Sequence, residues 1–271
     1  PEPFVTPTVA DLTDENVAGF LDWTIERGRS PYTANKQRAT LHALWRAARR
    51  SKLLEGEPTM EKIPTEKRVP EAWSLSEFAR ILEAASTAPG MVDDVPAGDW
   101  WRALLLTAYD TGLRISALLR TEPANLDQAE GWLRVKASTQ KQKAEQVFKL
   151  HAETLEAIGQ ILRPDHKFLF PWPYDPKRRV WRALTRHYRA ILRAAGVNAT
   201  KRDLFHKIRR TTATYLADKS GAAVAQAYLG HSCASVTAAY LDPTKIHAIQ
   251  ATDVLPRPEC VEGETLTPTA R

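Results

Sequence analysis

Three prolines at six-residue intervals, Pro58, Pro64 and Pro70, interrupt the chain early in its length. A proline fixes its own φ angle and lacks an N–H donor, so neither a helix nor a central strand continues through this segment. We therefore expect a charged linker at residues 57–73, between a small part at 1–56 and a larger part at 74–254. Residues 255–271 are rich in Pro, Thr and Glu and are expected to form a flexible tail.

The small N-terminal part is predicted to contain two helices. Thr13, followed by Asp14 and Glu15, is typical of a helix N-cap, and a second helix is expected over residues 31–50. Two helices form a thin core, so this part is either incomplete at its N-terminus or packs on the larger part. The chain begins with Pro-Glu-Pro-Phe, which is also consistent with a piece of a longer protein.

The larger part is predicted to be mainly α, with a small antiparallel β-hairpin. Ser74 to Glu77 have the pattern of a capping box, and residues 132–136 and 145–150 alternate like two strands joined by a polar loop at 137–144. Further helices are expected at residues 99–109, 177–195, 205–219, 222–229 and 235–241.

The charge balance points weakly towards a polyanionic partner. The formal net charge is +6, and Lys and Arg residues cluster at 46–52 and again at 177–182. Two solvated helix faces are the alternative explanation of these clusters. The two cysteines provide no disulfide framework and suit a reducing, cytoplasmic compartment. Cys233 follows His231 closely, but no further ligand completes a metal set, and no run of about 20 apolar residues predicts a membrane span.

Five polar side chains from distant stretches form an unusual set. Arg114 follows a Thr-Gly turn, His206 and Arg209 have the i, i+3 spacing of one helix face, and His231 precedes Tyr240 by nine residues. Each residue alone is more often structural. Together they suit a pentacoordinate phosphorus, whose oxygens need fixed positive donors while a hydroxyl attacks. We interpret the chain as an enzyme that cuts and rejoins DNA through a phosphotyrosine.

The segments that carry these residues resemble the tyrosine recombinases, which form the phage integrase family. The similar segments are residues 109–116, 206–211, 228–232 and 238–240, and their order and separations also match. The resemblance covers residues 74–243 and, more loosely, residues 30–50, which look like part of the family's core-binding domain. It implies a tyrosine recombinase catalytic domain preceded by a small helical core-binding domain, possibly truncated.

The resemblance also implies a role for each residue. Arg114 and Arg209 would hold the non-bridging oxygens of the scissile phosphate through fork-shaped hydrogen bonds. Tyr240 would attack phosphorus and form a 3′-phosphotyrosine. His206 would be the base that this phenol needs at neutral pH, and His231 would donate to the phosphate.

The family takes the acid for the leaving 5′ oxygen from a lysine of the β-hairpin. Lys141 fits this role by its position nine residues before Leu150, while Lys136 and Lys143 are rivals. Solvated loop lysines are the alternative for each of them. Because the covalent linkage conserves the phosphodiester energy, the resemblance implies no ATP, no metal and no other cofactor.

One residue departs from the family pattern. An acidic residue usually stands three positions after the first arginine, where this chain has Ala117. A catalytically weak or inactive DNA-binding relative is therefore the alternative function. A type IB topoisomerase is disfavoured by the small size and the separate N-terminal part. An RNA-directed or phosphatase-like enzyme has little support because its metal-binding and phosphate-loop motifs are missing.

The partner implied by the resemblance is double-stranded DNA, read by helices at residues 36–50 and 177–193, with Arg210 assigned to the DNA backbone or the surface. The family acts as a homotetramer on paired recombination sites, commonly in mobile elements, and a C-terminal segment is exchanged between protomers. Residues 245–254 could be that segment or could pack on their own domain. The protein would be cytoplasmic and associated with the nucleoid when bound to DNA.

Overall fold

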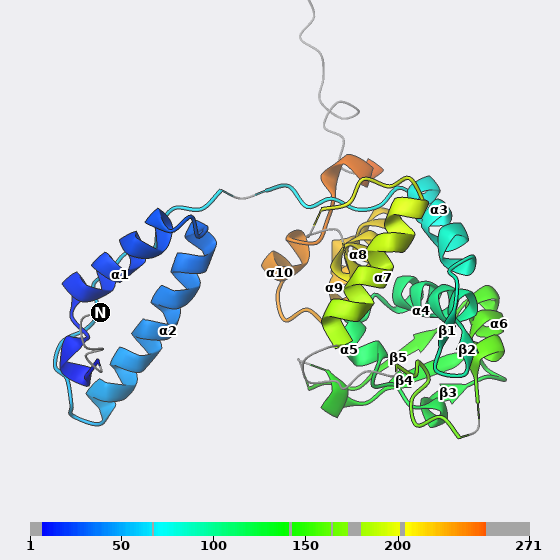
Figure 1. The fold of residues 1–271 in the computed structure, drawn as a ribbon, viewed down its shortest axis with the longest axis horizontal. Coiled ribbons are helices and arrows are strands. Elements are labelled where there is room, and N and C mark those ends of the chain that lie inside the picture. Colours follow the sequence, from blue (N-terminus) through cyan, green and yellow to red (C-terminus); the bar gives the residue numbers. More distant parts are fainter. Residues whose placement is uncertain are drawn as a thin grey trace, which may run out of the picture. The chain divides into compact units, whose positions relative to one another are not determined.

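The structure is a computed structural model that describes residues 7–66, 68–140, 143–163, 165–172, 180–200 and 204–247 (Figure 1). Contacts between Cα atoms divide the chain into two compact units, Pro1–Arg68 and Val69–Arg271. We call them the N-terminal unit and the C-terminal unit and describe each by itself.

The N-terminal unit is an antiparallel pair of helices. A short 3-10 turn, η1 (Val9–Asp11), precedes α1 (Asp14–Glu26) and α2 (Pro31–Arg50). The Thr13 side chain accepts a hydrogen bond from the first turn of α1, as its sequence predicted, and Ser30 does the same for α2. The small core consists of Leu12, Val17, Leu21, Ala34 and Trp45.

The segment that follows α2 packs on the same two helices. The Asn35 side chain donates to the carbonyl of Ile63 at 2.8 Å and accepts from its N–H at 3.0 Å. Thr59 donates to the Asp14 carboxylate from both its backbone and its hydroxyl. Residues 57–73, expected as a linker, are thus shared between the units, because their first part packs here and Trp73 is buried in the C-terminal unit.

The C-terminal unit is mostly helical and contains two small antiparallel sheets (Figure 1). Its helices and 3-10 turns are α3 (Leu75–Ser86), α4 (Ala97–Thr111), α5 (Ile115–Leu118), η2 (Pro123–Asn125), η3 (Ala137–Thr139), α6 (Ala152–Ile161), α7 (Val180–Ala194), α8 (Phe205–Ser220), α9 (Ala222–Leu229), α10 (Ala234–Ala238) and η4 (Pro243–Lys245). Its strands are β1 (Met91–Val92), β2 (Val95–Pro96), β3 (Leu126–Asp127), β4 (Trp132–Val135) and β5 (Gln146–Lys149).

The larger sheet has the strand order β3-β4-β5, with both pairs antiparallel. Leu133 of β4 lies opposite Phe148 of β5, and both side chains are buried, whereas Arg134 and its partner Val147 face outward. This alternation is the period-two pattern of a sheet with one solvated face. The β4–β5 hairpin therefore forms where the sequence predicted it.

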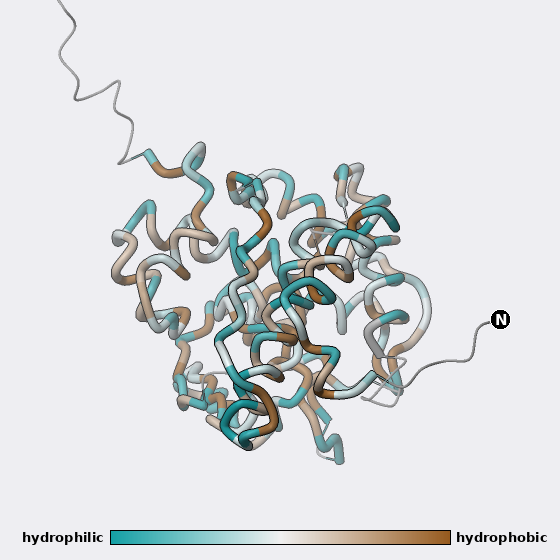
Figure 2. Tube along the Cα trace, turned by 90° about the vertical axis from the view of Figure 1, so that its left-hand side faces the viewer, coloured by the Kyte–Doolittle hydropathy of each residue, from teal (hydrophilic) through white to brown (hydrophobic). Residues whose placement is uncertain are grey.

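The core of the C-terminal unit is built around α4, which is buried along nearly its whole length and packs against α3, α6 and α8. Aromatic rings extend this core: Trp101 stacks on Phe205 of α8 and on Tyr188 of α7. Hydrophobic and hydrophilic stretches alternate along the trace, as amphipathic helices require (Figure 2). The prediction of a mainly α fold with a small antiparallel sheet is confirmed.

Several elements differ from their predicted extents. Helix α6 was not predicted from the sequence. The buried Thr154 interrupts its apolar stripe, and Gly159 lowers its helix propensity. It also missed β1, β2 and β3, which are two residues long and too short to show alternation. The last predicted helix, 235–241, ends earlier, so Tyr240 lies in the turn after α10 rather than within a helix.

The C-terminal end of the described chain packs on its own unit. Ile246 is buried against Ala217 of α8 and Ala225 of α9. Most of the segment 245–254, which could be exchanged between protomers, and the expected tail at 255–271 lie outside the described residues. In the part of the chain that the structure describes, no helix is long and apolar enough to cross a membrane.

Candidate active site

The turn between α4 and α5 presents Arg114. Gly112 ends α4 with a φ of +58°, and a Cβ atom built on it would lie 2.6 Å from Leu229 Cδ2. Only glycine suits both the left-handed conformation and this close approach. Thr212 of α8 donates to the carbonyl of Tyr109 at 2.7 Å and thereby fixes the end of α4 on α8. Arg114 then occupies the N-cap position of α5.

Arg209 of α8 connects this turn to the end of α9. Its side chain is almost fully buried, with the residue 2% exposed. Nη1 donates to the carbonyl of Gly112 at 2.6 Å, and Nη2 donates to the carbonyl of Leu229 at 2.9 Å. Among the described residues the buried Nε–H of Arg209 has no hydrogen-bond partner. One guanidinium thus joins two loops, and its Nε–H makes no hydrogen bond in the described part of the protein.

His231 follows the left-handed Gly230 that ends α9, and its ring lies between Arg209 and Thr237. Its Nε2 is 2.9 Å from Arg209 Nη2, and its Nδ1 is 3.0 Å from Thr237 Oγ1. Because a guanidinium only donates, Nε2 must accept, which places the proton of the neutral ring on Nδ1 and makes Thr237 its acceptor. The hydrogen bonds therefore determine the tautomer of His231.

The Tyr240 ring lies beside three of these side chains. Its centroid is 5.0 Å from that of His206 and 4.7 Å from that of His231, and Arg209 Cζ is 5.5 Å from the phenol ring centroid. The residue is half-buried. Its backbone carbonyl accepts a hydrogen bond of 3.3 Å from Thr214 Oγ1, so α8 holds the turn that carries the phenol.

A cavity of about 320 Å³ opens at this place. Arg114, His206 and Arg209 line it together, so two guanidiniums and an imidazole share one hollow. The remaining lining residues come from the α4–α5 turn, from α7 and from the start of α8: Leu113, Ile115, Ser116, Thr185, Leu204 and Phe205. The hollow therefore combines positively charged donors with walls that are mostly apolar.

Burial and neighbouring charges keep both histidines neutral. Burial, followed by the charges of Arg209, Arg210 and Arg114, lowers the pKa of His206 to about 4. Burial, followed by the charges of Arg209 and Arg114, likewise lowers the pKa of His231 to about 4. Burial is also the largest cause that lowers the pKa of Arg209 to about 10, so this residue stays charged at neutral pH.

This arrangement suits an anion and a nucleophile. The cavity is positively charged by its two guanidiniums, which an oxyanion can neutralise with charge-assisted hydrogen bonds. The neutral imidazole of His206 can accept a proton, and the phenol of Tyr240 lies within the same group of side chains. Among the described residues Arg209 is hydrogen-bonded to two carbonyls and an imidazole, so no carboxylate already compensates its charge there.

The structure brings Arg114, His206, Arg209, His231 and Tyr240 together, whereas Lys141 lies outside the described residues. Of the rival lysines, Lys136 is paired with Glu122 at 2.5 Å and Lys143 is exposed on a backbone with a φ of +51°.

Two residues beside the site, Ala117 and Arg210, were also singled out in the sequence. Ala117 is buried on α5, so the position of the expected acidic residue is apolar. Arg210 is half-buried, and its charge contributes to the low pKa of His206, which the assignment to DNA backbone or surface did not foresee.

Sequence reasoning missed the residues that hold this group in place. Thr237 orients His231, and Thr214 holds the carbonyl of Tyr240. Thr237 lies three residues before Tyr240, in a helix too short to need an apolar stripe. This spacing is the one sequence signal that could have indicated the role of Thr237. Thr214 lies among the closely spaced threonines 211, 212 and 214 of α8, in a stretch that reads as ordinary helix.

A row of arginines lies on the exposed face of α7, near the cavity wall formed by Thr185. Arg182, Arg186, Arg189 and Arg193 are spaced by four, three and four residues, which places them on one side of the helix. They line a hollow of about 660 Å³ together with the loop after α7. A second group, Arg46, Arg49 and Arg50, ends α2 in the N-terminal unit.

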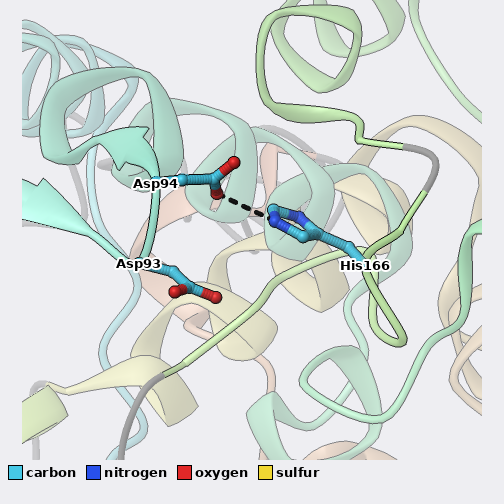
Figure 3. Close-up of side chains that lie close together, drawn as sticks. All are labelled: Asp93, Asp94 and His166. Carbon is cyan, nitrogen blue, oxygen red and sulfur yellow. Dashed lines mark ion pairs between the residues drawn. The ribbon is translucent and has the colours of Figure 1, made fainter.

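Asp93, Asp94 and His166 form a separate cluster on the surface of the C-terminal unit (Figure 3). The two carboxylates occupy the β1–β2 turn, and the half-buried His166 ring points at Asp94, with Nε2 at 2.8 Å from Oδ1. Arg163 approaches the other oxygen of Asp94 at 3.7 Å. Because Asp94 already has two basic partners and both aspartates are exposed, we describe the cluster as an ion-pair group and assign no metal to it.

Comparisons with known proteins agree with this geometry. Residues 74–247 match the model of the phage integrase family. Among curated proteins, the tyrosine recombinase XerC of Thermodesulfovibrio yellowstonii is 25% identical over 246 residues, covering 88% of this chain and 80% of the relative. XerC of Oceanobacillus iheyensis is 28% identical over 259 residues, covering 90% and 80%.

Solved structures show the same fold at lower identity. A lambda integrase dimer bound to a core site has a TM-score of 0.66 at 20% identity, covering 88% of this chain and 83% of that one. The integrase of transposon Tn1549 in complex with transposon right end DNA has a TM-score of 0.67 at 16% identity, covering 87% and 82%.

Proposed function

The chain belongs to the phage integrase family, and we propose that it is a site-specific DNA recombinase that cleaves and rejoins strands through a 3′-phosphotyrosine intermediate. The observation that carries this proposal is the position of Arg209. This one buried guanidinium contacts the turn that presents Arg114, accompanies His231, and lies beside the ring of Tyr240. A scissile phosphate in the adjoining cavity would meet the two guanidiniums and His206, with the phenol of Tyr240 beside Arg209.

The proposed reaction exchanges one ester for another. Tyr240 Oη forms a bond to phosphorus, and the bond between phosphorus and the 5′ oxygen breaks. The phenol proton passes to His206, which is neutral at physiological pH and can accept it. The departing 5′ oxygen takes a proton from a hairpin lysine, for which we propose Lys141. A 5′-hydroxyl of a second strand then reverses these steps, so no ATP is consumed.

Arg114 and Arg209 would stabilise the charge that develops on the non-bridging oxygens. In the structure His231 Nε2 accepts from Arg209. A bound phosphate brings negative charge, which favours the protonated ring, and a protonated His231 could donate from Nε2 to the phosphate. We therefore propose that substrate binding charges His231.

Double-stranded DNA is the proposed partner. The arginine rows of α7 and of the end of α2 are suited to phosphate oxygens, which supply most of the affinity of such complexes. Solved neighbours include a lambda integrase tetramer bound to a Holliday junction. By analogy we propose that four copies of this chain act on paired recombination sites.

A second candidate function is DNA binding without cleavage. The buried Ala117 favours it, because a carboxylate at that position could orient neighbouring basic groups. The recombinase is favoured because Arg114, His206 and Arg209 line one cavity and because His231 and Tyr240 lie beside Arg209.

Adduct formation distinguishes the two candidates. The probe is a pool of duplexes with randomised sequence, each interrupted by a nick that lets the short 5′-hydroxyl fragment diffuse away after cleavage. We expect wild-type protein to form a denaturation-resistant adduct and Tyr240→Phe to form none while still binding DNA. Arg209→Ala should lose the adduct yet retain much of the affinity, because many other basic residues share the non-specific interaction. A pool that binds wild-type protein but yields no adduct supports the binding-only function instead.

A further inference from the structure

Asp242 lies two residues after the proposed nucleophile, and its buried carboxylate accepts two hydrogen bonds at each oxygen. The residue is 2% exposed. Its Oδ2 accepts from the backbone N–H of Ala72 at 2.9 Å and from Lys245 Nζ at 3.0 Å. Its Oδ1 accepts from the backbone N–H of Thr244 at 3.0 Å and from the Thr244 hydroxyl at 2.6 Å. Because four donors bond to this carboxylate, a residue that cannot accept these hydrogen bonds would leave buried donors without a partner, which is costly.

The backbone of Asp242 is fixed as firmly as its side chain. Its N–H donates to Thr214 Oγ1 at 3.0 Å, and the same hydroxyl donates to the carbonyl of Tyr240 at 3.3 Å. Thr214 is fully buried on α8, the helix that also carries His206 and Arg209. The turn that presents the phenol is therefore held on both sides of residue 241 by one hydroxyl of that helix.

The residues before α3 form the other partner of Asp242. Trp73 donates its backbone N–H to Thr211 Oγ1 at 2.9 Å, and Lys207 Nζ lies 3.8 Å from the centre of the Trp73 ring. Ala72, which donates to Asp242, is thereby anchored on α8 as well. Asp242 thus joins three parts of the C-terminal unit: the start of that unit, α8, and the turn that carries Tyr240.

Asp242 is ionised at neutral pH despite its burial. Burial raises its pKa, but the hydrogen bonds from Ala72, Thr244 and Lys245 outweigh this effect and leave the pKa below its usual range. The negative charge therefore contributes to each of these hydrogen bonds.

We propose that Asp242 is a positioning residue for the nucleophile, which holds the Tyr240 turn against α8 and against residues 72–73 so that the phenol stays beside Arg209. This inference rests on the proposed function. It predicts that the carboxylate is needed for attack by Tyr240 but not for phosphate binding, since the hydrogen bonds that the Asp242 carboxylate makes within the described residues go to Ala72, Thr244 and Lys245.

The test compares Asp242→Asn with Asp218→Asn. Asp218 lies on α8 and is a matched control: its carboxylate is as buried as that of Asp242 and accepts the backbone N–H of His247 at 2.7 Å, but it has no contact with the Tyr240 turn among the described residues. Asparagine keeps the shape of Asp242 but turns one of its two accepting oxygens into a donor. With a nicked duplex recovered from the adduct assay, we expect Asp242→Asn to slow single-turnover cleavage by about tenfold to a hundredfold, the scale of a displaced reacting group. Asp218→Asn should cleave at the wild-type rate.

A second reaction separates positioning from general support of the fold. A DNA strand that ends in a 3′-p-nitrophenyl phosphate can be joined by attack of a 5′-hydroxyl on phosphorus, with p-nitrophenolate departing, so Tyr240 is not needed. We expect Asp242→Asn to join this strand at the wild-type rate and to bind the duplex with wild-type affinity.

Thr214→Val tests the same link from α8, because it removes the hydroxyl that holds Tyr240 and Asp242. It should show the same split between slowed cleavage and unchanged joining, and Thr214→Ser should restore cleavage. Either cleavage at the wild-type rate in both Asp242→Asn and Thr214→Val, or a parallel loss of cleavage and joining in them, overturns the inference. Wild-type protein that binds DNA without any adduct overturns the proposed function, and this inference with it.

Discussion

Arg209 combines two tasks in one side chain. Its Nη atoms donate to the carbonyls of Gly112 and Leu229, and Nη2 also contacts His231, while the buried Nε–H has no hydrogen-bond partner among the described residues. Lysine could not reproduce this, because an ammonium lacks the planar fork that reaches several acceptors at once. The residue therefore assembles the site and, in our proposal, also binds the phosphate.

Gly112 offers a direct test of how this turn is built. We expect Gly112→Ala to destabilise the protein by about 1–3 kcal/mol, because the new methyl group meets Leu229 Cδ2 at 2.6 Å on a backbone with positive φ. Thermal unfolding should show the midpoint falling by several degrees. Gly159→Ala is the matched control: no atom lies within 4 Å of its added Cβ, and alanine favours the helix α6. Equal midpoints for the two variants would contradict this account.

The low pKa values of the site histidines predict a pH dependence of stability. In the folded protein His206 and His231 stay neutral down to about pH 4, whereas in the unfolded chain they bind protons below about pH 6.5. The unfolded state thus holds more protons between these values, and the free energy of unfolding decreases as the pH falls from 6.5 to 4. The hydrogen bonds of Asp242 hold the pKa of that carboxyl below its usual range, so its protonation acts on stability mainly at lower pH than this window.

His206→Gln should flatten that decrease. The measurement is the free energy of unfolding by urea at a series of pH values from 6.5 to about 4.5, in wild type and variant. An unchanged slope would show that His206 is protonated as readily in the folded state as in the unfolded one.

At the level of elements, α8 organises the site. It supplies His206 and Arg209 to the cavity, Thr212 to the end of α4, and Thr214 to the Tyr240 turn. The i, i+3 spacing of the first pair was visible in the sequence because helical periodicity is local. The contacts of the threonines were not, since a hydroxyl on a helix is compatible with many partners and only the packing of α4, α9 and α10 selects them.

The arginine row on α7 leads to a prediction for this helix. If its side chains bind DNA phosphates, Arg186→Gln combined with Arg189→Gln should weaken binding to any duplex and reduce the slope of log K against log salt concentration by about 1 for each arginine. Arg102→Gln is a control with the same change in charge per site, at an arginine already paired with Glu153 on α6. The measurement is fluorescence anisotropy over a salt series. An unchanged slope in the double variant would remove α7 from the DNA interface.

At the level of the whole chain, the order of the motifs indicated which distant side chains lie together better than local patterns predicted the bounds of the elements. Arg209 and Gly112 are 97 residues apart, and no periodicity reports a contact over that distance. The resemblance to a family supplied it, because a family motif records which distant segments meet in the fold. The motif does not contain the hydrogen bonds of Asp242 or the apolar surroundings of Ala117. Both depend on how the neighbouring segments pack, which only the structure shows.

In the proposed reaction Tyr240 itself becomes joined to DNA. The most direct measurement is peptide mapping by mass spectrometry of the adduct formed on nicked duplex DNA, after nuclease digestion. We predict a single modified peptide that contains Tyr240 with a nucleotide attached to the phenol through its 3′-phosphate. A nucleotide carried by any other residue, or an adduct that persists in Tyr240→Phe, would contradict the account.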